Sequence, residues 1–529
     1  MQSHPKPCLQ LFPIEASKLI MLPLALAIPA LQLLLIILFI LSVAQLLNPK
    51  EHKNGRKYPP GPKPLPIIGN LHLLGKLPHR SIHELAKKYG PIMSLKLGQV
   101  PTIVVSSPET AELILKTHDS VFASRPLTQA SKYICYDSKG LIFSEYGSYW
   151  RNVTKLCTFE LLSVNKVQSF APLRSEEVRV FVKSLEKSAA SREVVNVSKR
   201  VGELVENVVQ KMIWGPSNIE NFDVKRLVHD VLHLMGVFDV GDYIPWVGAF
   251  DLQGLVRKFK KAHEEFDQML EQIIKDHEAP SRLSDQKNGQ SIDFTDTLLS
   301  HMKQSKDKHI INKTNLKAIL LDIIIGSLDT TIMTTDWAMS ELLRHPKAMT
   351  KLQDELKNVV GMGRVVEEDD IPKLPYLNMV VKETFRIHPP APLLVPRECL
   401  EDITINGYFI AKKSRVLVNS WTIGRDPKIW SDNAEDFYPD RFQNTDIDSH
   451  GLHFQFLPFG SGRRRCPGMQ LGLTTVPLVL AQLVHCFNWE LPLGMSANDL
   501  DMTEEFGLTT PRVQNLLAIP TYRLVNEGN

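Results

Sequence analysis

Most of the chain shows the hydrophobic spacing of amphipathic helices, with apolar residues recurring every three or four positions. Clear examples are Pro108–Thr117, Arg174–Ser188, Leu255–Lys275 and Met349–Val359. The longest stretch, Thr314–Arg344, ends at His345-Pro346, because proline stops a helix. At 1.5 Å per residue it covers about 45 Å, enough to cross a domain. Its first half is almost entirely apolar, which predicts a buried helix.

Alternating, strand-like patterns are limited to short runs. They are Ile92–Lys96, Thr102–Val105, Ile403–Ile405 and Arg415–Val418. Helix therefore outweighs strand, and no internal repeat is present. We expect a mainly α fold with a small β lobe, in the α+β class.

An uncharged run rich in Leu and Ile extends from Leu19 to Leu47. Its 29 positions exceed the roughly 20 residues that span a bilayer, which predicts one transmembrane helix. A cleaved signal peptide is the alternative, although its apolar region is usually about 7–15 residues long. Basic residues follow the run, from Lys50 to Lys63, and this charge bias places the rest of the chain in the cytosol. We expect a single-pass anchor in the endoplasmic reticulum membrane.

These patterns predict four parts along the chain. Residues 1–18 form an N-terminal lumenal extension, 19–47 the transmembrane signal anchor, 48–66 a basic collar and Pro-rich hinge, and 67–529 one large folded domain. Met1 and Met21 are both possible starts. Five Pro in the eight residues Pro59–Pro66 favour a stiff, extended hinge.

Composition excludes several classes of protein. The 61 Lys+Arg exceed the 58 Asp+Glu by only three over 529 residues, which argues against nucleic acid as a partner. The six Cys show no C-x-x-C spacing, which disfavours a zinc site or a disulfide scaffold. Three N-x-[ST] sequons occur, at Asn152, Asn196 and Asn312, and they have no meaning in a domain that faces the cytosol.

The strongest chemical motif is Phe459–Gly468, FGSGRRRCPG, which fits F-x-x-G-x-R-x-C-x-G. Positive charge and the N–H groups of a helix predicted over Leu471–Val484 favour a thiolate at Cys466. Gly468 lets a flat macrocycle approach closely, and Arg464 can pair with a propionate. A thiolate ligand donates electron density to haem iron and favours O–O cleavage. The alternative is a buried Cys in a basic loop.

A second constellation joins an acid with two arginines. Glu383 and Arg386 lie at i, i+3 on one predicted helix and can pair. This spacing is common on helix surfaces, but Arg441 in the segment Phe437–Phe442 can join the pair in a buried network. We expect this network to brace the loop that carries Cys466, with a structural role.

A third constellation lies within the long apolar helix. Gly326, Asp329 and Thr330 fall at i, i+3, i+4 and share a face. Glycine weakens a helix by about 1 kcal/mol relative to Ala, so it is unusual there. An acid–alcohol pair on this face can relay the two protons that O–O cleavage requires. The alternative is a Thr bonded back to its own helix carbonyl, with Asp329 solvated.

In this order, the three constellations resemble those of the cytochromes P-450, which are haem-thiolate monooxygenases. The resemblance extends from Tyr58 to about Pro520 and looks closest to plant microsomal A-type enzymes of the seventy-one clan. Further segments carry it: Phe122-Ala123-Ser124-Arg125-Pro126, Tyr149-Trp150-Arg151, Leu374-Pro375-Tyr376-Leu377, His388-Pro389-Pro390 and Val395-Pro396-Arg397. The resemblance implies a cytochrome P-450 fold, haem b, O2 as co-substrate, and electrons from NADPH through a flavoprotein reductase.

Residue roles follow from the same resemblance. Cys466 is the expected axial metal ligand, and Asp329 and Thr330 are the expected catalytic pair. The expected cofactor-binding residues are Cys466, Arg464, Arg397, Trp150, Phe459 and Gly468. The expected substrate pocket draws on Leu127–Leu141, Gly326, Ala391–Val395 with Leu393, and Leu508 with Thr509. These side chains are mostly apolar or small, which predicts a lipophilic substrate. Arg463 and Arg465 are expected to meet the reductase.

Three positions depart from the family pattern. Thr154 stands four residues after Trp150, where an Arg is usual, and we expect Lys155 or Arg151 to compensate. Ser327 replaces a second Gly in the long helix, and Asp440 replaces a Glu.

The leading hypothesis is a membrane-anchored monooxygenase whose catalytic domain faces the cytosol. It would hydroxylate a small lipophilic plant metabolite of phenylpropanoid or biphenyl type, with the reductase and membrane lipid as partners. One alternative is a haem-thiolate isomerase or dehydratase that acts on a peroxide without reductase. Another is a degenerate, non-catalytic haem-binding membrane protein. NADPH dependence and the reduced, carbon-monoxide-bound absorbance spectrum distinguish the three.

Overall fold

Helices carry most of the chain in this computed structural model, which describes residues 29, 31–40, 56–215, 217, 219–280, 292–304, 312–492 and 494–525. The chain divides into two compact units: Met1–Arg56 with Leu65–Ile67, and Lys57–Pro64 with Ile68–Asn529. In the first unit the described part includes the short apolar helix Leu31–Ile40. The rest of the predicted anchor, the lumenal extension and both candidate start residues lie outside the described residues.

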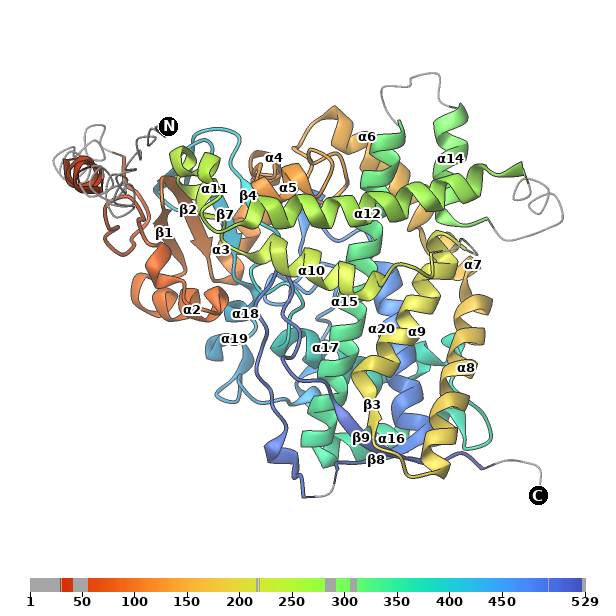
Figure 1. Ribbon diagram of the computed structural model, residues 1–529. Helices are drawn as coiled ribbons and strands as arrows, with labels where there is room; N and C mark the ends of the chain where they lie inside the picture. Colours follow the sequence, from red (N-terminus) through yellow and green to blue (C-terminus); the bar gives the residue numbers. More distant parts are fainter. Residues whose placement is uncertain are drawn as a thin grey trace, which may run out of the picture. The chain divides into compact units, whose positions relative to one another are not determined.

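The helices of the second unit form two consecutive sets along the chain, those before residue 313 and those from it onward, and most are labelled in Figure 1. The first set is α2 Pro78–Tyr89, α3 Pro108–Glu112, α4 Asp119–Phe122, α5 Gln129–Tyr133, α6 Ser148–Leu156, α7 Val164–Ser169, α8 Ala171–Ala190, α9 Val197–Ile213, α10 Val224–Gly236, α11 Val240–Tyr243, α12 Leu255–Glu278 and α14 Phe294–Gln304. The second set is α15 Lys313–Arg344, α16 Pro346–Val360, α17 Pro375–Ile387, α18 Ser420–Ile423, α19 Pro427–Trp430 and α20 Met469–Cys486.

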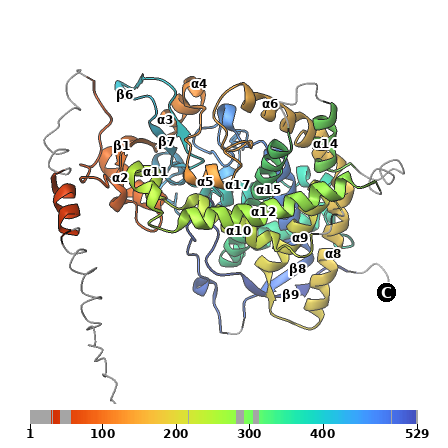
Figure 2. The same cartoon turned by 45° about the horizontal axis from the view of Figure 1, so that its top comes forward.

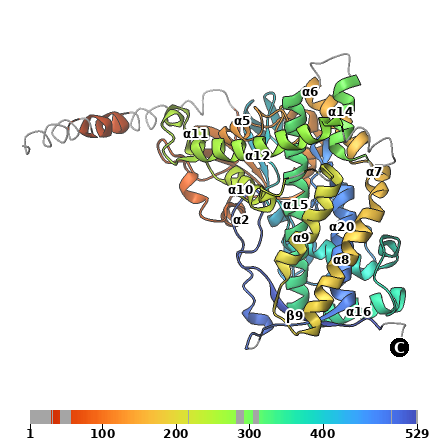
Figure 3. The same cartoon turned by 45° about the vertical axis from the view of Figure 1, so that its right-hand side comes forward.

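The long helix α15 runs through the centre of this unit. Asn312 and Asn315 form a capping box at its start, and His345 ends it just before Pro346. It packs against α9 and α20, and Figure 3 shows these helices side by side with α8. In Figures 1 and 2, α12 crosses this bundle, with α10 beside it. Because neighbours cover α15 on several sides, most of its side chains are buried.

Three small sheets make up the β part. The largest has the strand order β1 (Ile92–Leu97), β2 (Val100–Val105), β7 (Arg415–Val418) and β4 (Arg397–Glu398). Strand β2 is antiparallel to β1 and parallel to β7, and β4 is antiparallel to β7. The second sheet is β3 (Val195–Asn196), β9 (Leu517–Tyr522) and β8 (Phe487–Glu490), all antiparallel, and the third pairs β5 (Ile403–Ile405) with β6 (Tyr408–Ile410).

Two hydrophobic cores correspond to these parts. The larger one fills the helical bundle around α9, α15 and α20, and the smaller one lies under the largest sheet with α3 and α4. Strand β4 belongs to the largest sheet, and it places Arg397 at the boundary between sheet and helices. The expected mainly α fold with a small β lobe is therefore observed.

Part of the predicted hinge is tied to the folded body. The carbonyl oxygen of Lys57 accepts a hydrogen bond from Phe409 N at 2.6 Å, and that of Pro60 from Ser94 N at 2.8 Å. A Cβ at Gly61 would lie 1.9 Å from Ser94 O, so glycine is required for this close approach. Residues 57–64 are thus hydrogen-bonded to strands of the β part and do not form a free linker.

Among the described residues, α20 is the one helix that is both long and apolar enough to cross a membrane. However, 67% of its most apolar window is buried inside the folded unit, so it serves as a core helix. The described helix Leu31–Ile40 covers ten residues of the predicted anchor.

Candidate active site around Cys466

Cys466 lies in a tight loop just before α20. Its N–H donates to the carbonyl oxygen of Phe459 at 2.9 Å, which closes the loop. Gly462 in this loop has a φ of 72°, and a Cβ there would lie 2.1 Å from the carbonyl oxygen of Leu115. Only glycine fits this position, because it tolerates the positive φ and fills no space. The glycine spacing of the motif is therefore what folds the loop around the thiol.

The surroundings of Cys466 act on the pKa of its thiol and leave space at Gly468. Burial raises the pKa of this thiol, while the N–H of Gly468 and the charge of Arg465 act in the opposite direction. A Cβ at Gly468 would lie 3.9 Å from Sγ and, among the described residues, would meet nothing else within 4 Å. The ring of Phe459 packs edge-on against Phe385 of α17, at 5.3 Å between centroids. This arrangement suits the approach of a flat group to the sulfur.

A cluster of buried arginines lies beside this loop. Arg397 donates to a carboxylate oxygen of Asp119 at 2.8 Å. The guanidinium of Arg464 lies 4.1 Å from the ring centroid of Trp150 and donates to backbone carbonyls. Arg125 is also buried and donates only to backbone carbonyls among the described residues. In the described part of the chain, Asp119 is the one carboxylate bonded to these three arginines.

The charges of this cluster do not balance, which provides a test for the expected haem. Burial and the neighbouring Arg397 lower the pKa of Arg464 to about 9, and burial with the other two arginines lowers the pKa of Arg125 well below its usual value. Among the residues that the structure describes, Arg125, Arg397 and Arg464 have only the Asp119 carboxylate beside them, and Asp119 also pairs with Arg463 at 3.1 Å, so at least two positive charges are in excess. The two propionates of haem would balance this excess, so the residues present fit the group.

The two residues expected to compensate for the missing arginine, Arg151 and Lys155, do not lie in the buried cluster. Arg151 and Lys155 are both exposed on α6, whereas Arg125 is the third guanidinium buried in the cluster. The Oγ1 of Thr154 is buried on the same helix and has no hydrogen-bond partner among the described residues. Arg125 and Asp119 are thus site residues that sequence reasoning missed, because their partners come from distant segments.

The long helix α15 carries the predicted acid–alcohol pair, and the two residues bond to different partners. Thr330 Oγ1 donates to the carbonyl oxygen of Gly326 at 2.8 Å, one helical turn back. Asp329 accepts a hydrogen bond from Thr509 Oγ1 at 2.7 Å, and burial raises the pKa of this carboxyl. A Cβ at Gly326 would meet no atom within 4 Å, so this face of the buried helix borders open space. The Ser327 hydroxyl donates to a helix carbonyl.

The structure brings Glu383, Arg386 and Arg441 together. Arg386 contacts both carboxylate oxygens of Glu383, at 2.7 and 2.8 Å, and Arg441 Nε contacts one of them at 2.8 Å. Other N–H groups of Arg386 and Arg441 donate to backbone carbonyls within residues 424–436, including those of Gly424 and Asp436. The network therefore fastens α17 to the segment that precedes the Cys466 loop, rather than to the loop itself.

A cavity lies on the side of the largest sheet that faces α10. Its lining includes Leu393 and Leu508 from the predicted pocket, with Phe143, Met235 and Phe259, and only a few polar groups. Gly326 and Thr509 are not among its lining residues. The structure thus places two of the four named pocket residues on one apolar cavity.

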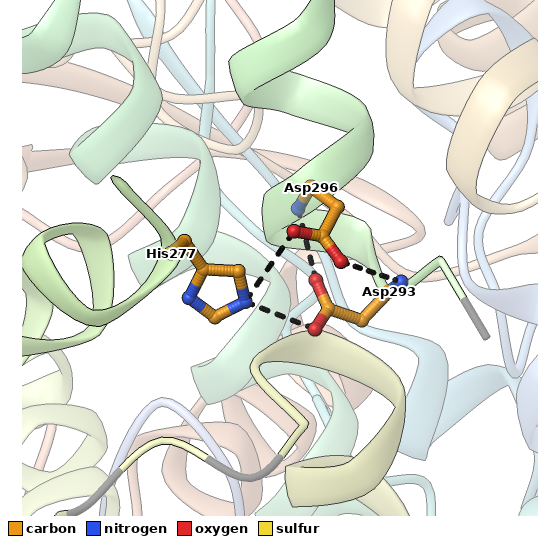
Figure 4. A group of neighbouring side chains, drawn as sticks. All are labelled: His277, Asp293 and Asp296. Atoms are coloured by element: carbon orange, nitrogen blue, oxygen red, sulfur yellow. Dashed lines mark hydrogen bonds and ion pairs between the residues drawn. The ribbon is translucent and has the colours of Figure 1, made fainter. Parts of the chain in front are cut away.

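A second cluster of ligand-type side chains lies far from this site in the fold. The imidazole of His277 faces the carboxylates of Asp293 and Asp296, and the three ligand atoms lie within 4.8 Å of one another (Figure 4). His277 Nε2 is 2.9 Å from Asp293 Oδ2, and Asp293 also accepts from the backbone N–H of Asp296. Burial alone would lower the pKa of His277, but the hydrogen bond and charge of Asp293, the bond to the Ile273 carbonyl and the charge of Asp296 together outweigh burial and raise the pKa. These contacts fasten the end of α12 to the start of α14.

Comparisons with known proteins agree with this geometry. A family model described as cytochrome P450 matches residues 59–517. The chain is 52% identical over 478 residues to cytochrome P450 CYP736A12 of Panax ginseng, covering 89% of this chain and 95% of the relative. It is 44% identical to cytochrome P450 71A1 of Persea americana over 83% of this chain and 89% of the relative. A zebra fish cytochrome P450 structure with progesterone superposes with a TM-score of 0.70 at 25% identity, covering 84% of this chain and 99% of that one.

Proposed function

The chain belongs to the cytochrome P450 family and is a haem-dependent monooxygenase, and from this premise we propose that it hydroxylates a small lipophilic plant secondary metabolite. We propose an aromatic substrate of phenylpropanoid or biphenyl type, and an NADPH-dependent flavoprotein reductase as the source of electrons. Haem with a thiolate ligand supplies the activation of O2 and the insertion of one oxygen atom.

The apolar cavity carries the proposal of a lipophilic substrate. Leu393, Leu508, Phe143 and Phe259 contribute to a lining in which polar groups are few. Burying a lipophilic molecule against such walls is favourable at about 25 cal/mol per Å² of apolar surface. Polar side chains of the lining, among them Thr102, Asp242 and Arg415, can orient the molecule without requiring it to be charged.

The Cys466 loop and the arginine cluster would hold the haem. The Gly468 N–H and the positive charge of Arg465 favour the thiolate form of Cys466, which is the form that binds iron. Arg397 and Arg464, with Arg125, would pair with the propionates, and Trp150 holds Arg464 in place through its ring.

The acid and the alcohol of α15 would deliver protons. Asp329 is partly buried, and the desolvation of its carboxyl raises its pKa, so it holds a proton more readily than a solvated acid does. Thr330 would present its hydroxyl after exchanging the bond to Gly326 O for one to the reacting oxygen. The open space at Gly326 leaves room for this exchange.

The described helix Leu31–Ile40 supports the proposal of a single-pass anchor in the endoplasmic reticulum membrane. In the folded unit, Trp246, Phe250 and Leu252 are all strongly exposed in one short segment. Exposed aromatic and aliphatic side chains in one segment favour contact with a lipid surface. We propose that the catalytic domain faces the cytosol. Addition of glycans at the exposed Asn152 or Asn312 would contradict this orientation.

The full chain in microsomes, with added reductase and NADPH, provides the test of the proposed reaction. A panel of plant phenolics and terpenoids is incubated under 18O2, and the products are analysed by mass spectrometry. We expect at least one aromatic compound to gain one 18O atom, only when both NADPH and reductase are present. A matched reaction with Cys466→Ala enzyme provides the blank.

The alternative functions predict different results. Conversion of a peroxide without NADPH or reductase would indicate an isomerase or dehydratase and would overturn the proposal. Absence of the thiolate-type Soret band in the reduced, carbon-monoxide-bound state would indicate a non-catalytic protein. A product whose oxygen comes from water would also contradict the proposed reaction.

A further inference from the structure

A hairpin near the C-terminus reaches the acid of α15. Residues 503–513 fold back on themselves, with Val513 N donating to Thr503 O at 3.0 Å and Glu505 N to Pro511 O at 2.8 Å. Residues 506–510 form the tip. The sequence predicted only that Leu508 and Thr509 are walls of the substrate pocket.

The base of the hairpin is fixed by contacts that involve two buried carboxylates, Glu504 and Asp336. Glu504 contacts His79 at 3.0 Å and Arg80 at 2.7 Å, both from α2. Arg512 contacts Asp336 of α15 at 3.3 Å. These contacts, on both arms, hold the hairpin against two helices that are far apart in the sequence.

The tip of the hairpin is fixed against α10 and α15. Leu508 N donates to the carbonyl oxygen of Leu232 at 3.0 Å. A Cβ at Gly236 would lie 2.2 Å from the carbonyl carbon of Gly507, so the two backbones touch. The indole N–H of Trp337 donates to Thr510 O at 3.0 Å. Because hydrogen bonds hold both Leu508 and Thr510, the position of Thr509 between them is fixed.

Thr509 uses this fixed position to contact Asp329. Its hydroxyl donates to Asp329 Oδ2 at 2.7 Å, and its side chain is buried. The charged groups that act on Asp329 from farther away are Lys225 and His229 of α10 and Glu505 of the hairpin. His229 and Glu505 lie 3.6 Å apart and are partly exposed. Thr509 is thus the near neighbour of the acid, and the charged groups are remote.

We propose that Thr509 is the positioning residue of Asp329: its hydroxyl holds the carboxylate in one orientation and links the acid to the hairpin. This inference rests on the proposed role of Asp329 in proton delivery. Leu508, the adjacent residue, lines the cavity, so a bound substrate presses on the same hairpin that holds the acid. Proton delivery is thereby tied to occupation of the cavity.

The direction of the effect on Asp329 follows from its surroundings. Burial raises the pKa of Asp329, and the hydrogen bond from Thr509 opposes this rise. Loss of the Thr509 hydroxyl therefore raises the pKa of Asp329 further. The acid would then keep its proton at a pH where the wild-type residue releases it.

The test compares Thr509→Val, which keeps the shape and loses the hydroxyl, with Thr509→Ser, which keeps the hydroxyl. Thr510→Val is the matched control, because the Thr510 hydroxyl contacts Pro389 O at 3.4 Å and not Asp329. The first measurement is an infrared pH titration of the Asp329 carboxyl band in the full chain, without substrate or reductase. Asp329→Asn identifies the band by its loss.

We expect the titration midpoint in Thr509→Val to rise by about one pH unit, which is a tenfold change in proton affinity. Thr509→Ser and Thr510→Val should stay within about 0.3 units of the wild type. An unchanged midpoint in Thr509→Val, or an equal shift in Thr510→Val, would overturn the inference.

A second measurement separates positioning from mere contact. With reductase and NADPH, Thr509→Val should release more peroxide and yield about tenfold less product per NADPH near pH 7, with recovery in Thr509→Ser. A shifted titration with unchanged product yield would show that the bond has no role in proton delivery. If Asp329→Asn turns over normally, the proposed role of Asp329 fails, while the infrared titration still decides whether Thr509 controls its carboxylate.

Discussion

Removal of the Glu383 carboxylate should destabilise the folded unit strongly. Glu383 is fully buried and accepts four hydrogen bonds, two from Arg386, one from Arg441 and one from the backbone N–H of Tyr438. Both guanidiniums are buried as well. Without Glu383 the two positive charges lose their common partner, although both arginines keep their bonds to backbone carbonyls.

The magnitude follows from the cost of leaving a buried charge unpaired. Removing one partner of a buried ion pair costs about 3–5 kcal/mol, and here one carboxylate serves two arginines. We expect Glu383→Ala to lose about 3–5 kcal/mol of unfolding free energy, compared with about 5–15 kcal/mol for the whole stability of a typical domain. Glu383→Gln keeps the volume and one oxygen acceptor, so its loss should be smaller than that of Glu383→Ala and still above about 1 kcal/mol.

The assay is a urea titration of the detergent-solubilised full chain, followed by far-ultraviolet circular dichroism. Glu490→Ala is the matched control, because the Glu490–Arg192 pair spans 3.1 Å between side chains that are 60% and 71% exposed. That pair should contribute less than about 1 kcal/mol. A loss below about 1 kcal/mol in Glu383→Ala, or a loss equal to that of Glu490→Ala, would refute the reasoning.

Three further predictions concern the site and its surroundings. Cys466→Ala should abolish the thiolate-type Soret band. Thr330→Ala should keep this band and yield about tenfold less product per NADPH, because peroxide is released instead. An unchanged product yield would refute the relay role of Thr330. Burial raises the pKa of Asp322 to about 7, above its value in the unfolded chain, so the contribution of Asp322 to stability falls as pH rises from about 4 to 7. In urea titrations at stepped pH, Asp322→Asn should therefore flatten this part of the stability profile. An unchanged slope would contradict the prediction. Arg465 is an exposed residue of the Cys466 loop, so Arg465→Glu should raise the KM for reductase about tenfold, measured on the enzyme that keeps the thiolate-type carbon-monoxide band; equal KM values would exclude this side chain from the docking surface.

Local patterns predicted the long helices well, because apolar spacing and proline stops are local signals. The predicted stretch Thr314–Arg344 begins one residue after α15 begins and ends at the same residue, because Pro346 stops the helix. Pro108–Thr117 was expected as one helix, but α3 ends at Glu112 and a π-helix follows over Leu113–Thr117. Side-chain spacing cannot separate the two, because the difference lies in the backbone hydrogen bonds.

The site was predictable where its residues are close in sequence and not where the fold assembles it. Glycines and arginines within ten residues identify the Cys466 loop, and one helix turn places Arg386 beside Glu383. The contact of Thr509 with Asp329 joins residues 180 positions apart, so no local pattern contains it. Arg125 belongs to a segment noted for its resemblance alone, and its burial beside other arginines depends on how the sheet meets the helices.

Helix α20 has a consequence for how the chain is made. By length and hydropathy it is a possible membrane span, yet the folded unit buries most of it. It is synthesised after residues 57–468 of the folded unit, which precede it in the chain. At about 5–20 residues per second, a ribosome takes about 20–80 s to make residues 57–468 first. The helices that cover α20 are thus translated before it, and the nascent body can accept this segment before a membrane does. A chain with an early helix such as α8 or α15 deleted would present α20 to the membrane insertion machinery without its partners.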